Sequence, residues 1–174
     1  MPNGSSSGSH VGYRLAAPLL SRRPTAGAPK RAITHLSELS GGKFTRQLLV
    51  DSSKGTTFLK PLDVYSTPAM IWDMEWHVRE LIFQIGLHGS EGWDSVGTRV
   101  EFSHTAATVI GARVTLVTEV TEVDVNKRRV VARTTFSDAL GELGHGVHER
   151  AVVKMGKVNE RIAARKAELD AREQ

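Results

Sequence analysis

The chain has 174 residues, with 23 basic and 19 acidic side chains, a formal net charge of +4 and no cysteine. A length of this order predicts one domain with a sizeable core. The lack of cysteine excludes disulfides, cysteine-ligated zinc and a thiol nucleophile, and the apolar runs are too short for a membrane-spanning helix. The sequence therefore predicts a globular protein without disulfides that does not cross a membrane.

The positive charge is concentrated at the N-terminus. Five basic residues precede the first acidic residue, Glu38, and the rest of the chain has 18 basic and 19 acidic residues, a net charge of −1. Residues 1–37 contain much Gly, Ser and Pro, which predicts a disordered or targeting arm. A nucleic-acid-binding arm is the weakest interpretation, because spread charges alone are a poor signature. We expect a cytoplasmic protein, or one of the mitochondrial or plastid matrix if the arm is a transit peptide.

The rest of the chain predicts one domain, residues 38–155, followed by an exposed helix, residues 156–174. Apolar side chains recur at steps of three and four in residues 68–87, which predicts one long helix that starts after Thr67 and stops at Gly86 or Gly89. Alternating patterns predict strands at residues 43–50, 95–105, 113–123, 128–137 and 143–153. One strand, a long helix and four antiparallel strands predict an α+β domain whose sheet curls around the helix.

Three separated motifs carry a family resemblance. They are STPAMIWDME at residues 66–75, SVGT with SHTAAT at residues 95–108, and GHGVHERAV at residues 144–152. Together, over residues 43–160, they resemble the fluoroacetyl-CoA thioesterase family of the hotdog superfamily. The resemblance implies a hotdog fold, in which an antiparallel sheet wraps around one long central helix. It also implies hydrolysis of an acyl-CoA thioester to a carboxylic acid and free CoA.

The resemblance also assigns residues and partners. It implies that Thr67, Glu75 and His104 form the catalytic set, and that Gly97 and Arg150 contact the substrate or CoA. It further implies a homodimer with active sites at the interface, with association into a dimer of dimers left open. Neither a metal nor a redox cofactor is expected, and neither a nucleic acid nor a membrane is an expected partner.

The residues themselves are compatible with this chemistry. Thioester hydrolysis needs a base that activates water or a hydroxyl group, and donors that stabilise the oxyanion. Glu75 lies eight residues after Thr67, so about 12 Å of helix separates them, and they can bracket a substrate but cannot pair directly within one chain. The backbone N–H groups of Ala69 and Gly97 are candidate oxyanion donors. Thr67 is either the nucleophile or the group that positions water.

Each assignment has a structural alternative. Thr67 alone is more typical of an N-cap, and Glu75 alone could pair with Arg79 four residues further along the helix. A single strand histidine such as His104 is more often structural. Arg150 could contact a CoA phosphate or simply pair with a carboxylate.

Other functions are weaker. A metal site at His145, His148 and Glu149 is not expected, because residues 145 and 148 of a strand face opposite sides. A hydratase or dehydratase of enoyl or hydroxyacyl thioesters is an alternative enzyme on the same fold. A non-catalytic acyl-CoA-binding module is the non-enzymatic alternative.

Overall fold

The computed structural model describes residues 35–56, 58, 63–84 and 92–173. The elements in chain order are η1 (His35–Leu39), β1 (Lys43–Leu49), η2 (Ser52–Lys54), α2 (Thr67–Ile82), β2 (Trp93–His104), β3 (Arg113–Asp124), β4 (Arg129–Asp138), β5 (Gly141–Lys154) and α3 (Met155–Arg172). The five strands form one antiparallel sheet in the order β1-β3-β4-β5-β2. The predicted α+β fold and its five strands are confirmed.

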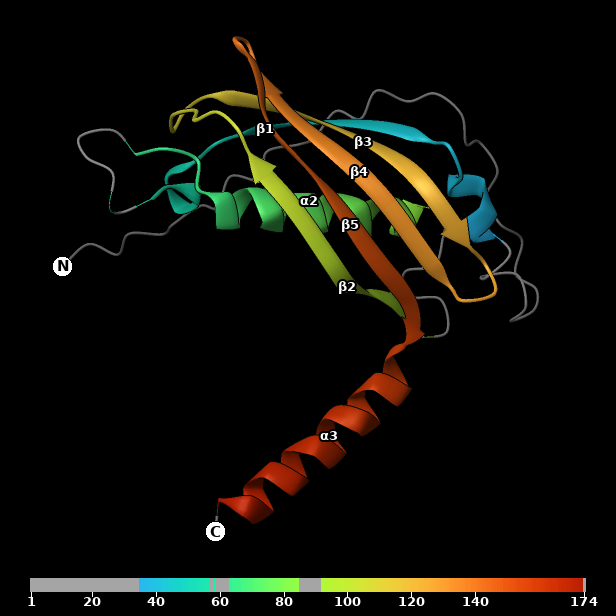
Figure 1. Ribbon diagram of the computed structural model, residues 1–174. Helices are drawn as coiled ribbons and strands as arrows, with labels where there is room; N and C mark the ends of the chain where they lie inside the picture. Colours follow the sequence, from blue (N-terminus) through green and yellow to red (C-terminus); the bar gives the residue numbers. More distant parts are fainter. Residues whose placement is uncertain (1–34, 57, 59–62, 85–91, 174) are drawn as a thin grey trace, which may run out of the picture.

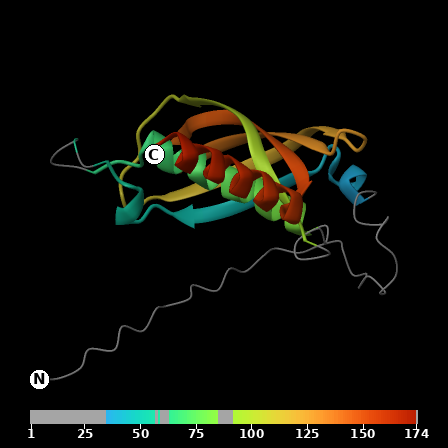
Figure 2. The ribbon, with the colours of Figure 1, turned by 90° about the horizontal axis from the view of Figure 1, so that it is seen from below.

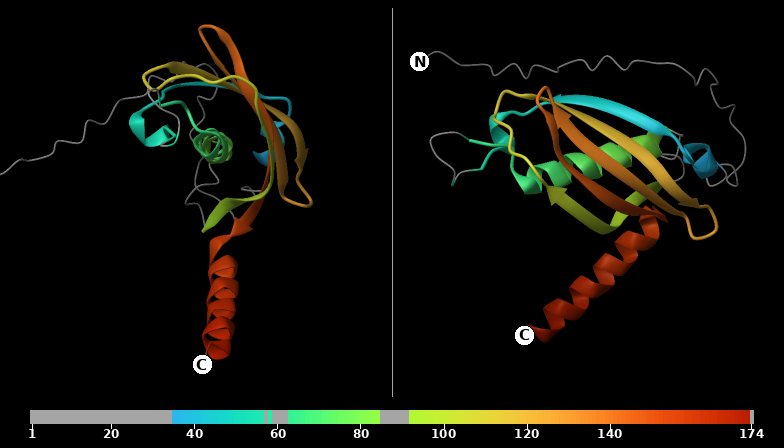
Figure 3. Two further views of the ribbon diagram at one scale, coloured as in Figure 1. Left: turned by 60° about the vertical axis from the view of Figure 1, so that its left-hand side comes forward. Right: turned by 45° about the horizontal axis from the view of Figure 1, so that its top comes forward.

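The sheet curls around α2, which lies along its concave face (Figure 1). Viewed nearly along the helix axis, α2 occupies the hollow of the curved sheet (Figure 3). One side of α2 supplies the buried residues Met70, Met74, His77, Val78, Leu81 and Ile82. The apolar ones pack against inward side chains of the strands in two clusters, one around Met70 and Met74 and the other around Val78 and Ile82.

Core packing extends to residues before 38, where the sequence predicts the start of the domain. Leu36 in η1 is fully buried in the core. The stop of the long helix at Gly86 or Gly89 lies outside the described residues, as does the arm at residues 1–34. The disorder and targeting predictions for that arm therefore stay predictions.

The C-terminal helix α3 projects away from the sheet (Figures 1 and 2). None of its residues is buried, which agrees with the exposed helix that the sequence predicts. An i,i+4 pair between Arg172 and Glu168, with Nη2 and Oε1 2.6 Å apart, lies near its end, as expected from the spacing. No helix within the described part of the chain is long and apolar enough to cross a membrane.

A β-bulge in β2 decides which of its side chains face α2. The pairing register with β5 shifts between Gly97 and Arg99. Before the bulge, Ser95 and Gly97 lie opposite inward residues of β5, and after it Phe102 and His104 do so. The extra residue reverses the alternation of the strand, so Gly97 and His104 both face the helix.

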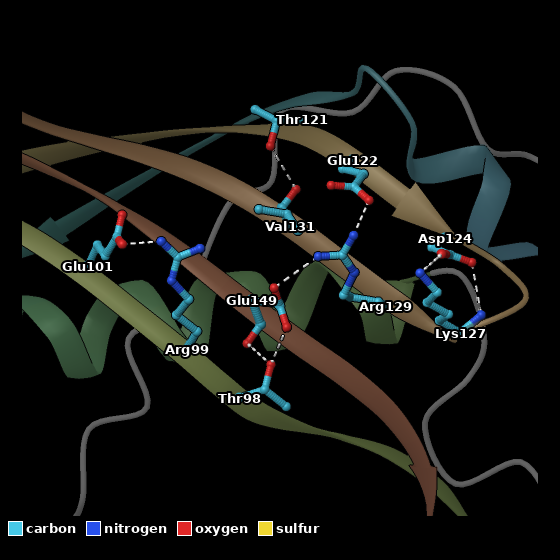
Figure 4. A network of polar contacts seen from close by, with 10 residues as sticks. All are labelled: Thr98, Arg99, Glu101, Thr121, Glu122, Asp124, Lys127, Arg129, Val131 and Glu149. Carbon is cyan, nitrogen blue, oxygen red and sulfur yellow. Dashed lines mark hydrogen bonds and ion pairs between the residues drawn. The ribbon is translucent and has the colours of Figure 1, made fainter.

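The outer face of the sheet carries a polar network that includes Thr98, the residue at the bulge of β2 (Figure 4). Thr98 Oγ1 in β2 donates to Glu149 Oε1 at 2.9 Å, and Arg129 Nη1 in β4 donates to Glu149 Oε2 at 3.1 Å. Arg129 also contacts Glu122 in β3. The hydrogen bond from Thr98, which has the largest effect, and the one from Arg129 lower the pKa of Glu149. The network ties four strands together and holds the bulge residue Thr98 on the outside.

A second polar chain lies inside, between the helix and the sheet. His77 Nδ1 of α2 and Thr118 Oγ1 of β3 are 3.0 Å apart, and Thr118 Oγ1 lies 2.7 Å from Thr134 Oγ1 of β4. Burial, and then the positive charge of Arg46, lowers the pKa of His77 to about 4. His77 is therefore a neutral, hydrogen-bonded core residue near pH 7.

Candidate active site

Ser66 and Thr67, which lie next to each other at the start of α2, have different roles. The N-cap is Ser66, whose Oγ accepts a hydrogen bond from Ala69 N at 3.3 Å, while Thr67 is the first residue of the helix. The interpretation of Thr67 as the N-cap is therefore wrong. Because Ser66 satisfies the helix end, the hydroxyl of Thr67 is released from capping and can take another partner.

Because Ser66 caps the helix and Thr67 does not, substitutions at these two neighbouring residues should change stability by different amounts. We expect Ser66→Ala to lower the free energy of unfolding by about 1 kcal/mol, because the cap is lost. We expect Thr67→Val, which keeps the side-chain shape, to change it by less than about 0.5 kcal/mol. Denaturation by urea, followed by circular dichroism, measures both. A larger loss for Thr67→Val than for Ser66→Ala would contradict the assignment of the cap.

Thr67 and His104 form a hydrogen-bonded pair. Thr67 Oγ1 lies 2.8 Å from His104 Nδ1, and His104 Nε2 lies 2.9 Å from the carbonyl oxygen of Ala106. A carbonyl oxygen only accepts, so Nε2 carries a proton, and in the neutral ring Nδ1 is then the acceptor for the Thr67 hydroxyl. The arrangement is a hydroxyl, an imidazole and an orienting acceptor in sequence. Both ring nitrogens of His104 thus have partners, one of which is Thr67.

Nearby backbone and side-chain hydrogen bonds hold the segments that carry Thr67 and His104. Ala106 N donates to the carbonyl oxygen of Leu143 in β5 at 3.1 Å, which positions the carbonyl that orients His104. On the helix side, the buried Tyr65 donates from its hydroxyl to Asp73 Oδ2 at 2.5 Å, and Lys54 Nζ contacts the same carboxylate at 2.7 Å. These contacts anchor the segment that leads into Thr67.

Glu75 belongs to a second cluster further along α2. Its Oε1 accepts from Arg150 Nη1 at 3.1 Å, and Arg150 also donates to Ser95, from Nε to Oγ at 2.9 Å and from Nη2 to the carbonyl oxygen at 2.6 Å. The predicted alternative of a Glu75–Arg79 pair is wrong, because Arg79 pairs with Asp94. Arg150 is 2 % exposed. Its hydrogen-bond partners in the described structure are Ser95 and Glu75, so the structure favours the carboxylate role of Arg150 and lends no support to a contact with CoA phosphate.

The surroundings of Glu75 form an open pocket of about 290 Å³, lined in part by Trp72, Glu75, Gly97 and Arg150. The side chain of Glu75 is 38 % exposed, so its carboxylate faces the pocket and is not enclosed by the core. A Cβ on Gly97 would lie 3.4 Å from Glu75 Oε1 and 3.0 Å from Nε2 of His148. Only glycine allows these groups to approach the strand so closely.

The structure thus brings some predicted residues together and leaves others apart. Thr67 with His104 forms one cluster, and Glu75 with Gly97 and Arg150 forms the other. Eight residues of helix, about 12 Å, separate the two within one chain. Of the two candidate oxyanion donors, Ala69 already donates its N–H to Ser66.

Two residues of the site were not predicted from the sequence. Ser66 was overlooked as the cap because Thr67, which directly precedes Pro68, has an equally good capping side chain. His148 was considered only as a metal ligand and rejected. The alternation of β5 could have placed it beside Arg150, two positions further along the same face.

The metal hypothesis receives no support from this geometry. His148 faces the helix and is fully buried, whereas His145 is on the outer face, where its Nδ1 lies 2.7 Å from Glu142. In the described ranges, no three His, Asp or Glu side chains converge as metal ligands would.

The architecture is that of the hotdog-fold thioesterases, and comparison with known proteins agrees. The family model described as fluoroacetyl-CoA-specific thioesterase, FlK, matches residues 46–156. The chain belongs to this family. It is 32 % identical over 130 residues to the fluoroacetyl-CoA thioesterase of Streptantibioticus cattleyicolor, an alignment that covers 70 % of this chain and 90 % of that protein. The prediction of a thioester hydrolase of this family is confirmed.

Solved structures give the same result. A structure of the fluoroacetyl-CoA thioesterase FlK superimposes with a TM-score of 0.64 and 31 % identity, over 72 % of this chain and 95 % of that one. A hot-dog-like protein from Thermanaerovibrio acidaminovorans superimposes with a TM-score of 0.64 and 28 % identity, over 75 % of this chain and 96 % of that one. A third structure is a phenylalanine-to-alanine variant of FlK in complex with fluoroacetate and CoA, with a TM-score of 0.58 and 31 % identity, over 68 % and 98 %.

Proposed function

We propose that the chain hydrolyses an acyl-CoA thioester with Thr67, His104 and Glu75 as its catalytic residues. The observation that carries this proposal is the hydrogen bond of 2.8 Å between Thr67 Oγ1 and His104 Nδ1. His104 is oriented to take the proton of the Thr67 hydroxyl, or of a water held by it. The complex of an FlK variant with CoA supports a CoA ester as the substrate. The reaction needs no redox group and no metal.

The proton balance is the same for both possible roles of Thr67. If Thr67 Oγ1 attacks the thioester carbon, His104 takes its proton and passes it to the departing sulfur of CoA. Glu75 then accepts a proton from the water that hydrolyses the acyl-threonine ester, and that proton returns to Thr67 Oγ1 as the acid leaves. If water attacks directly, Glu75 accepts the proton of that water and returns it to the departing sulfur, while Thr67 and His104 orient the thioester. Mass spectrometry of the protein quenched during turnover distinguishes them, because only the first route adds the mass of an acyl group to Thr67.

We further propose that the two clusters meet across the interface of a homodimer. Within one chain they lie about 12 Å apart along α2. β2 is the last strand of the sheet, and no strand among the described residues pairs with its outer edge, where residues 97–101 are exposed. An unpaired edge next to the exposed rings of Trp72 and Trp76 is a surface that a second subunit would cover. A measurement of the mass in solution would show whether dimers associate into a dimer of dimers.

Release of free thiol from a panel of acyl-CoAs is the direct test. We expect stoichiometric thiol and carboxylic acid from at least one saturated acyl-CoA, measured with a thiol reagent and by chromatography of the acid. A hydratase would instead change enoyl-CoA without releasing thiol. An acyl-CoA-binding module would bind the esters without turnover. Either of these results in place of thiol release would overturn the proposed function.

A further inference from the structure

The side chain of His148 is buried and has no partner of its own. It lies in β5, is 0 % exposed, and neither ring nitrogen has a hydrogen-bond partner within the described structure. Buried polar atoms in folded proteins are nearly always hydrogen-bonded, so a buried imidazole with two free nitrogen atoms needs an explanation. His77, the other buried histidine of the helix–sheet interface, has Thr118 as its partner.

The Nε2 atom of His148 lies next to Gly97, a residue of the wall of the pocket beside Glu75. The Nε2 atom lies 3.0 Å from the position that a Cβ on Gly97 would take, and Glu75 Oε1 lies 3.4 Å from that same position. Gly97 and Glu75 both line the pocket of about 290 Å³. The imidazole and the carboxylate therefore face the same bare α-carbon at the wall of the pocket, beside the bulge of β2.

The neighbours of His148 on the sheet cannot satisfy its ring. Across the strands it lies opposite Val100 of β2 and Ala132 of β4, and Gly146 precedes it on the same face. These residues have no polar side-chain atoms. Arg150 follows on that face, but it offers only donors, and its guanidinium is directed to Ser95 and Glu75. None of these neighbours is therefore a partner of Nε2, and a group bound against Gly97 in the pocket is the candidate partner.

The charge state of His148 suits a hydrogen-bond donor. Burial, and then the positive charge of Arg150, lowers the pKa of His148 to about 4, against the opposing effect of Glu75. The ring is therefore neutral near pH 7 and keeps one N–H. A neutral imidazole can polarise a carbonyl group without becoming an acid itself, a role known from other enzymes.

We propose that His148 donates a hydrogen bond from Nε2 to the carbonyl oxygen of the bound thioester and stabilises the oxyanion that develops there. The proposal rests on the proposed function and adds an oxyanion donor to it. His148 forms and breaks no covalent bond and keeps its proton throughout. Of the two predicted donors, the N–H of Ala69 already donates to the capping Ser66, so His148 would act beside the remaining candidate, the N–H of Gly97.

Three substitutions separate this role from packing. Gln places an amide nitrogen the same number of bonds from Cα as Nε2 of histidine, Asn places it one bond nearer, and Leu has no donor. We expect His148→Leu and His148→Asn to lower kcat by about 10²-fold with little change in KM, and His148→Gln to retain most of the activity. We expect His148→Leu to melt at the same or a higher temperature, because it removes an unpartnered polar group.

The control is His77→Leu. It removes a buried histidine that has a partner, so it should lower the melting temperature and leave kcat per folded molecule unchanged. A kcat of His148→Leu within twofold of the wild type would overturn the proposal. So would an equal loss of kcat in the Gln and Leu variants.

A probe that cannot be hydrolysed keeps this test independent of turnover. The dethia analogue of acetyl-CoA, in which a methylene replaces the sulfur, carries a ketone where the thioester carbonyl lies, and its labelled carbonyl can be followed by isotope-edited infrared spectroscopy. We expect the carbonyl stretch of the bound probe to be lowered in the wild type and in His148→Gln, and to return toward its free value in His148→Leu. An unchanged stretch in His148→Leu would contradict the role of His148. A wild type that shows this shift but releases no thiol would contradict only the proposed function.

Discussion

Two inactive variants, Glu75→Gln and His104→Ala, are expected to regain activity when their subunits are mixed. Alone, each should lower kcat by about 10²-fold or more, the usual scale for lost acid–base catalysis. In a mixed dimer, one site combines the intact His104 of one subunit with the intact Glu75 of the other. Because half of the dimers formed from equal amounts are mixed and each has one intact site, about a quarter of the wild-type activity should return.

The measurement is thiol release after the two variants are unfolded together and refolded, or co-expressed with different tags. A mixture of two preparations of His104→Ala is the matched control and should regain nothing. If both clusters acted within one chain, every site of the mixed dimer would lack one residue. No recovery would therefore contradict the shared site. Near wild-type turnover of both single variants would contradict the catalytic assignments themselves.

A steep loss of stability in mild acid is the second large effect. The pKa values of His77 and His148 are each lowered from 6.5 to about 4 in the folded protein. Above pH 6.5 both histidines are neutral in the folded and the unfolded chain. Between pH 6.5 and 4 only the unfolded chain binds their protons, so the free energy of unfolding should fall with pH, by about 3 kcal/mol for each histidine.

Urea denaturation at pH values from 4 to 7 measures this dependence. We expect His77→Leu and His148→Leu each to reduce the slope between pH 4.5 and 6 by about one proton, because each removes one group that is protonated only on unfolding. The stability that Asp138 and Glu149 contribute through their lowered pKa values is lost only as the pH falls through their ordinary values of 3.8 and 4.5. A slope that is unchanged in both variants would show that the buried histidines are not its source.

Much of the fold could be predicted from the sequence because its patterns are local and strong. The alternation of residues 113–123 and 128–137 predicted β3 and β4 within one or two residues, and the spacing of apolar side chains predicted α2 from near its first residue. Helices and strands with one buried face carry that face in their sequence. The order of the strands in the sheet was not predicted from the sequence.

The site was harder to predict, because its geometry depends on contacts between distant elements. Thr67 and His104 are 37 residues apart, and only the fold reveals that they are hydrogen-bonded. The partner of Glu75 was misjudged, because the i,i+4 spacing favours Arg79, whereas the curvature of the sheet brings Arg150 closer. Tertiary contacts override local spacing in both cases.

The bulge of β2 has a consequence for the comparison of related chains. In a regular strand, two residues on one face are separated by an even number of positions, but Gly97 and His104 are seven positions apart. An odd separation between this glycine and this histidine is therefore a criterion for relatives that keep both groups at the helix, whatever residues lie between them. A chain shortened by one residue at Thr98 would retain every catalytic side chain and would still turn the imidazole away from Thr67.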